Sequence, residues 1–137
     1  MTSIGDWTFE GCTGLTSVTL PESLISLGVR GTFADCTGLT GITIPEGVTD
    51  IGYWAFAGCT GLTSVIFTDS VASIDDFAFL GCTVLTDVTL PKGLTYIGYY
   101  AFASCPNLSN IIIPDSVADI IEEGIFTGDP DPDDLPG

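Results

Sequence analysis

The sequence repeats with a period of 23 or 24 residues, and this repeat restricts the possible folds more than any other feature. Its five cysteines are separated by 24, 23, 23 and 23 residues, with a phenylalanine three residues before each and a leucine three residues after each. These columns are Phe9, Phe33, Phe56, Phe79 and Phe102; Cys12, Cys36, Cys59, Cys82 and Cys105; and Leu15, Leu39, Leu62, Leu85 and Leu108. A unit this short cannot bury its own apolar side chains, so the units must stack and share one continuous core.

Each unit is expected to contain two short extended segments and one turn. Residues 17–20 alternate polar and apolar side chains, which predicts a strand, and the proline that follows would end it. Residues 48–52 resemble a second extended piece, and residues 53–58 fit a short helical turn that ends at a C-cap glycine, Gly58. The sequence therefore predicts a solenoid of about five units over residues 1–126, followed by an acidic, proline-rich tail or linker at 127–137.

Two units carry one inserted residue each. The spacing from the isoleucine or leucine column to phenylalanine is normally five residues, but it is six from Leu27 to Phe33 and from Ile120 to Phe126. Because the core columns keep their positions, we expect the extra residues, near 29–31 and 122–124, to lie in surface loops.

Charge and composition exclude several functions. The formal net charge is −16, and Arg30 and Lys92 are the two basic residues, so nucleic acid and anionic membranes are poor partners. The chain has no histidine, which removes the most common general base and metal ligand, and we expect no enzyme activity and no cofactor. No apolar run approaches the ~20 residues needed to span a bilayer, and the first residues have no signal-peptide pattern.

One run resembles a known repeat family. The pattern Ile51-Gly52-x-x-Ala55-Phe56-x-Gly58-Cys59-x-x-Leu62-x-x-Val65 is similar to the BspA-like class of leucine-rich repeat, and it recurs with small changes from Ile4 to about Phe126. The resemblance implies a curved leucine-rich-repeat solenoid, with short parallel strands on the concave face and loops and short helical turns on the other side. It also implies an extracellular or cell-surface protein that binds host or matrix proteins. The asparagine of the common leucine-rich motif is absent, since that column reads Ser23, Gly47, Ser70, Gly93 and Ser116.

The cysteine column is best interpreted as a ladder of buried, reduced side chains. Neighbouring units lie ~5 Å apart, a distance that permits disulfides, but five equivalent positions cannot pair completely. Ligands in a single column would be strung along the axis, which argues against a metal site. The acidic tail, Asp129 to Asp134, resembles the start of a calcium loop but lacks its glycine and its final glutamate, so we interpret it as a solvated tail or linker.

The outward side of the first strand is the candidate binding face. Its two rows carry small polar and β-branched residues: Ser17, Gly41, Ser64, Asp87 and Asn110, and Thr19, Thr43, Ile66, Thr89 and Ile112. Exposed Ile66 and Ile112 would mark a contact patch. The alternative is that β-branched residues simply suit strands. A second candidate patch consists of the aromatic residues of the turns, Trp7, Tyr53, Trp54, Tyr99 and Tyr100, which would either contact a partner or cover the seam between units.

These patterns favour a non-catalytic module that binds a protein or matrix ligand. One alternative is a structural spacer that self-associates through its open solenoid ends, because open ends expose strand edges and core side chains. Another is ice or crystal-surface binding through the threonine column Thr16, Thr40, Thr63 and Thr86, which Ser109 interrupts. The sequence does not identify the partner.

Overall fold

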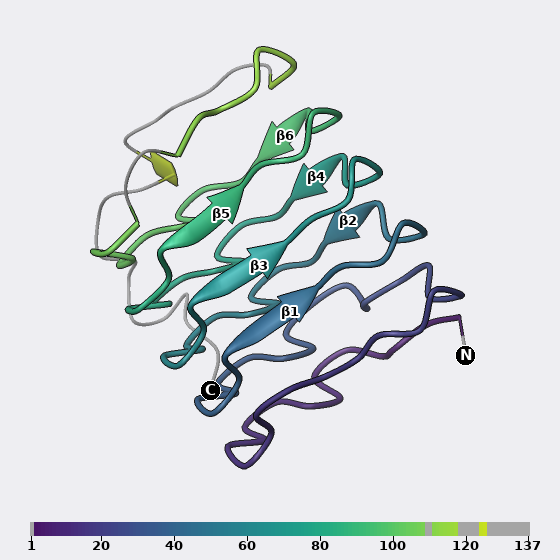
Figure 1. The fold of residues 1–137 in the computed structure, drawn as a ribbon, viewed down its shortest axis with the longest axis vertical. Coiled ribbons are helices and arrows are strands. Elements are labelled where there is room, and N and C mark those ends of the chain that lie inside the picture. Colours follow the sequence, from purple (N-terminus) through teal and green to yellow (C-terminus); the bar gives the residue numbers. More distant parts are fainter. Residues whose placement is uncertain (1, 109–110, 118–123, 126–137) are drawn as a thin grey trace.

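The protein forms a solenoid of stacked units, as the repeat predicts. The computed structural model describes residues 2–108, 111–117 and 124–125. Three strands, β1 (Gly41–Thr43), β3 (Ser64–Ile66) and β5 (Asp87–Thr89), form one parallel sheet among these residues. The strands β2 (Asp50–Ile51), β4 (Ser73–Ile74) and β6 (Tyr96–Ile97) form a second. Figure 1 shows the two rows of strands running side by side along the solenoid.

The strands pair in the register of the repeat. Ile42 pairs with Val65 and Val65 with Val88 in the first sheet, and Ile51 pairs with Ile74 in the second. Single bridges continue the ladders toward the N-terminus, for example from Ser17 to Gly41. One residue of a column therefore lies beside the next, so each column becomes a continuous stripe along the molecule.

The phenylalanine column forms the centre of the core. The rings of Phe9, Phe33, Phe56, Phe79 and Phe102 stack nearly parallel, with centroids 5.2 to 5.4 Å apart. The rings at 33, 56 and 79 are fully buried, which confirms the expectation that they are among the most buried side chains. The leucine and isoleucine columns pack around this stack in the same apolar cluster.

The cysteines make a second internal ladder, and all five are free thiols. The Sγ–H of Cys59 donates to the carbonyl of Phe33, 3.1 Å away, and Cys82 donates to the carbonyl of Phe56 at 3.2 Å. Cys36 and Cys105 make the equivalent bond. Cys12 is partly exposed, because in the described chain no unit packs on its outer side, so the expectation of complete burial holds for four cysteines and is wrong for this one.

The turn at residues 53–58 is not helical, which corrects the expectation from sequence. Trp54 and Gly58 both have left-handed backbone angles, with φ of 54° and 73°. Alternate amides bond within the turn and to the next unit: Ala57 N donates to the carbonyl of Trp54, whereas Phe56 N donates to the carbonyl of Ala78. A helix would use all of these amides internally and leave neighbouring units unconnected.

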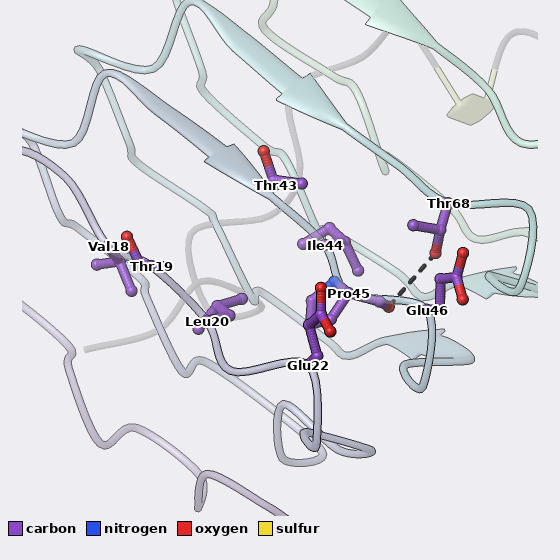
Figure 2. Close-up of a pocket in the computed structure, with 9 residues that line it drawn as sticks. All are labelled: Val18, Thr19, Leu20, Glu22, Thr43, Ile44, Pro45, Glu46 and Thr68. Carbon is purple, nitrogen blue, oxygen red and sulfur yellow. Dashed lines mark hydrogen bonds between the residues drawn. The ribbon is translucent and has the colours of Figure 1, made fainter.

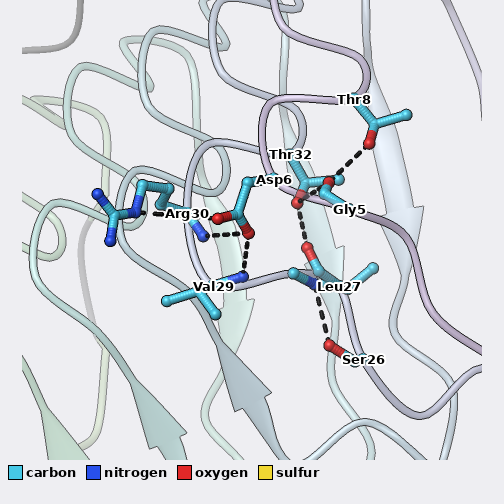
Figure 3. Close-up of polar contacts among 9 residues, drawn as sticks. Gly5, Asp6, Thr8, Ser26, Leu27, Val29, Arg30 and Thr32 are labelled. Atoms are coloured by element: carbon cyan, nitrogen blue, oxygen red, sulfur yellow. Dashed lines mark hydrogen bonds and ion pairs between the residues drawn. The ribbon is translucent and has the colours of Figure 1, made fainter.

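The inserted residue of the second unit lies in a surface loop, as predicted, and the first unit holds this loop in place. The Asp6 carboxylate accepts hydrogen bonds from the amides of Val29 at 2.6 Å and Arg30 at 3.3 Å, and it lies 4.0 Å from Nε of Arg30 (Figure 3). The buried Thr32 hydroxyl donates to the carbonyl of Leu27. The second predicted insertion, and the tail at 127–137, fall largely or wholly outside the described residues.

Candidate functional site

The structure brings the predicted outward rows together on one face. Thr43 lies beside Ile66, which lies beside Thr89, in the registered sheet of β1, β3 and β5. Ile66 is 60% exposed and Ile112 is 82% exposed, which confirms their outward orientation. We call this surface the strand face; it comprises the outward side of β1, β3 and β5 and the equivalent residues 17–19 and 111–113.

The first of the two predicted rows, which begins at Ser17, varies in solvent exposure. Ser17 and Asp87 are exposed, whereas Gly41 and Ser64 are partly buried. The parallel register places Ser64 between Gly41 and Asp87. Asn110 lies outside the described residues, so its part in this row stays a prediction.

Open hollows follow the edge of the strand face where the strands end. One, of about 590 Å³, is lined by residues of the first two units and Thr68 (Figure 2). A second, of about 500 Å³, lies across β3 and β5, and a third, of about 270 Å³, includes Ile112. The hollows are shallow and follow one another along the sheet. This shape suits a macromolecule that docks on the surface better than a small molecule held in an enclosed cleft.

Carboxylates line these hollows. Glu22 and Glu46 line the first hollow, and Asp69 and Asp87 line the second. The three residues at 22, 46 and 69 occupy one column, directly after the proline or threonine that ends each strand. The sequence shows this column of acidic residues, but only the structure shows that the column borders the hollows.

The aromatic residues of the turns divide into two sets. Trp54 stacks on Phe77 with centroids 5.3 Å apart, and Phe77 stacks on Tyr100 at 5.6 Å. Trp7 continues this row at 6.2 Å from Trp54. These rings cover the seam between units, one of the two predicted roles. Tyr53 and Tyr99 instead point outward and are 40% and 53% exposed.

A group of carboxylates lies on and beside the second sheet. Burial, together with the charges of Asp50 and Asp76, raises the pKa of Asp75 from 3.8 to about 6. Asp75 stands where the other described units have Gly5, Gly28, Gly52 or Gly98. Nearby, the Tyr96 hydroxyl donates to Asp76 at 3.2 Å, and burial and the Asp76 charge raise the pKa of Tyr96 to about 12.

The core cysteines and the carboxylates are the remaining groups whose chemistry bears on a site in the described part of the chain. Burial raises the pKa of Cys59 to about 12, so its thiol is not poised to act as a nucleophile. The interaction with Cys105, together with burial, raises the pKa of Cys82. Across residues 2–108, 111–117 and 124–125, no cluster of three or more cysteine or carboxylate side chains is arranged to hold a metal ion. The same residues contain no helix long and apolar enough to cross a membrane.

Comparison with known families identifies the repeat. The BspA type leucine rich repeat region matches residues 2–130 in six copies. The chain belongs to this family. Leucine-rich repeats generally mediate binding to other proteins. No curated protein matches the chain.

Solved structures of other leucine-rich repeat proteins share the fold. A leucine-rich repeat protein from Bacteroides ovatus is 37% identical, with a TM-score of 0.80 over 85% of this chain and 30% of its own. A leucine rich repeat protein from T. pallidum is 29% identical, with a TM-score of 0.76 over 86% of this chain and 55% of its own. A leucine rich cell surface protein from Faecalibacterium prausnitzii is 28% identical, with a TM-score of 0.52 over 81% of this chain and 42% of its own. The chain therefore spans less than two thirds of each of these proteins.

Proposed function

We propose that this BspA-type repeat is a non-catalytic module that binds a protein or matrix ligand through the strand face, as part of a cell-surface adhesion or matrix-binding protein. The exposure of Ile66 and Ile112 beside the open hollows carries the proposal, because large apolar side chains in a registered polar row favour contact with a partner. The surface location is supported by the cell surface protein of Faecalibacterium prausnitzii, which shares the fold.

The test is binding to immobilised matrix proteins, such as collagen, fibronectin and laminin, by surface plasmon resonance. The double change Ile66→Lys and Ile112→Lys is expected to weaken binding by at least about tenfold, because a buried unpaired charge at a contact costs several kcal/mol. The thermal midpoint should change little, because both side chains are exposed.

The matched control replaces the outward tyrosines of the turns, Tyr53→Ser and Tyr99→Ser. These side chains are also exposed but lie outside the strand face. Binding should survive this control. If the tyrosine pair abolishes binding and the lysine pair does not, the turns are the binding site; if the unmodified protein binds none of the matrix proteins, the proposal is wrong.

End-to-end assembly is the second candidate. In the N-terminal unit five core side chains are only partly buried; they are Phe9, Cys12, Leu15, Val18 and Leu20. A further unit or a second copy stacked on this end would bury them. Sedimentation at several concentrations tests this, since a monomer at all concentrations would contradict it.

The threonine column does not support the ice-binding alternative. The hydroxyl of Thr63 donates to the carbonyl of Thr40 at 3.0 Å, and Thr40 and Thr86 make longer equivalent bonds to the preceding unit. These protons connect the units and are not free for a crystal surface. We therefore do not propose this function.

A further inference from the structure

The first two hollows at the edge of the strand face carry only negative charge. Glu22, Glu46, Asp69 and Asp87 line the first two hollows, and Lys92 lines the third. No basic side chain lines these two hollows, and the described residues show an ion pair between Arg30 and Asp6 on a different part of the surface. A partner that docks here must therefore supply positive charge, or binding will lose the free energy needed to bury unpaired carboxylates.

The carboxylates are also regularly spaced. Glu22, Glu46 and Asp69 occupy equivalent positions in three successive units, and neighbouring parallel strands lie about 4.8 Å apart. Figure 2 shows Glu22 and Glu46 beside Pro45, where the strands end. The amide of Lys92 donates to Asp69 at 3.4 Å, so this carboxylate leans along the solenoid axis toward the following unit. The result is a row of negative charge that runs across the strands.

This spacing matches an extended polypeptide that lies along the solenoid axis. In a polyproline II segment every third residue points the same way and advances about 9.3 Å. Two repeat units advance about 9.6 Å, which is the separation expected between Glu22 and Asp69. A small cation is a poorer fit, because the described residues contain no carboxylate cluster compact enough to hold a metal ion.

We propose that the strand face takes a cationic, extended polypeptide segment, whose lysine or arginine side chains pair with Glu22 and Asp69, with Glu46 between them, while its apolar groups contact Ile66. The inference rests on the proposed function, because it names the partner class of the same face. The exposed isoleucine supplies apolar contact, and the carboxylate row determines the partner's direction and charge.

The experiment measures binding of a synthetic peptide of repeated Pro-Pro-Lys triplets, with a Pro-Pro-Glu peptide as the probe of opposite charge. The intact chain should bind the lysine peptide, more weakly as salt rises, and should not bind the glutamate peptide. The triple change Glu22→Gln, Glu46→Gln and Asp69→Asn should weaken the Kd by about tenfold or more, a loss of about 1.4 kcal/mol.

The matched control changes the net charge by the same amount elsewhere, with Glu10→Gln, Asp35→Asn and Asp50→Asn. These residues are exposed and lie outside the hollows described above. The control should keep most of the affinity. Equal losses in the two triple variants, or no binding of the lysine peptide at low salt, would overturn the cationic-partner inference.

The matrix-protein assay separates this inference from the proposed function. If the Ile66→Lys and Ile112→Lys pair abolishes binding to a matrix protein while the Glu22, Glu46 and Asp69 variant binds it normally, the strand face is a binding site but its partner is not recognised by charge. If neither variant affects that binding, the strand face itself is excluded, whatever the peptides show.

Discussion

Several non-glycine residues of this repeat adopt backbone angles that normally favour glycine. The position before each cysteine is left-handed throughout: Gly11, Gly58 and Gly81 occupy it in three units, whereas Asp35 and Ser104 have φ of 58° and 57°. A left-handed angle costs an ordinary residue roughly 1–2 kcal/mol, because Cβ approaches the following carbonyl oxygen. The repeat therefore carries local strain where the column departs from glycine.

Ser104→Gly is expected to stabilise the protein by about 0.5–1 kcal/mol, since the relief of the left-handed angle exceeds the added freedom of the unfolded chain. Ser104 is exposed, so little packing is lost. Urea unfolding measures the change. Ser104→Ala is the control and should give no gain, because alanine keeps the Cβ; equal stabilisation by alanine and glycine would refute the strain argument.

Asp75 makes stability depend on pH. Its pKa is raised from 3.8 to about 6 in the folded protein. Between pH 3.8 and 6 the Asp75 carboxyl is therefore protonated in a larger fraction of folded than of unfolded molecules. The contribution of this group to stability is therefore greatest below about pH 4 and falls as pH rises through 6. The neighbouring charges of Asp50 and Asp76 oppose its ionisation.

Asp75→Asn should be more stable than the parent chain at pH 7.5, by on the order of 1 kcal/mol once partial exposure is allowed for. The difference should shrink toward zero at pH 4, where the parent carboxyl is protonated. Chemical denaturation at a series of pH values measures it, with the exposed Asp115→Asn as a reference. A difference that is independent of pH would show that packing, not charge, is responsible.

At the scale of the elements, the ring stack connects each unit to its neighbours. Phe56 contacts Phe33 at 5.4 Å and Phe79 at 5.2 Å, and its ring is fully buried. Phe56→Ala is expected to cost about 3–5 kcal/mol and to divide unfolding into separate transitions, because it weakens two interfaces between units. Calorimetry tests both effects. Ile66→Ala, at an exposed position, should change stability by less than about 0.5 kcal/mol; a single, unshifted transition for Phe56→Ala would contradict the stack's role.

The repeat spacing predicted the stacked columns, because a column is defined by which residues face inward. It did not predict the conformation of the turns. A helical turn and the observed left-handed turn both bury Phe56. Which of the two conformations forms depends on the hydrogen bond from the Phe56 amide to the carbonyl of Ala78. That bond joins two units, so the sequence of one unit does not reveal it. Likewise, strand alternation predicted that Ile66 faces outward, whereas the hollow beside Glu46 depends on how the chain turns after Pro45.

The whole molecule behaves as a row of units, each stabilised by its neighbours. Phe33, Phe56 and Phe79 and their neighbouring leucines in the central units are fully buried, whereas Phe9 and Leu15 in the first unit are only partly buried. Opening the first unit breaks one interface between units, and opening a central unit breaks two. Stability is therefore expected to decrease from the centre of the solenoid toward this end.

Native-state hydrogen exchange tests this gradient with two matched amides. The amide of Phe9 donates to the carbonyl of Thr32 at 2.9 Å, and the amide of Phe56 donates to the carbonyl of Ala78 at 2.7 Å, so each makes one bond to the following unit. If the individual bond determined protection, the two amides would exchange at similar rates. Because exchange requires a unit to open, and the free energy of opening depends on the number of interfaces broken, we expect the Phe9 amide to exchange markedly faster. Equal protection would mean that the described units unfold as one cooperative block, and the additive description of this solenoid would then be wrong.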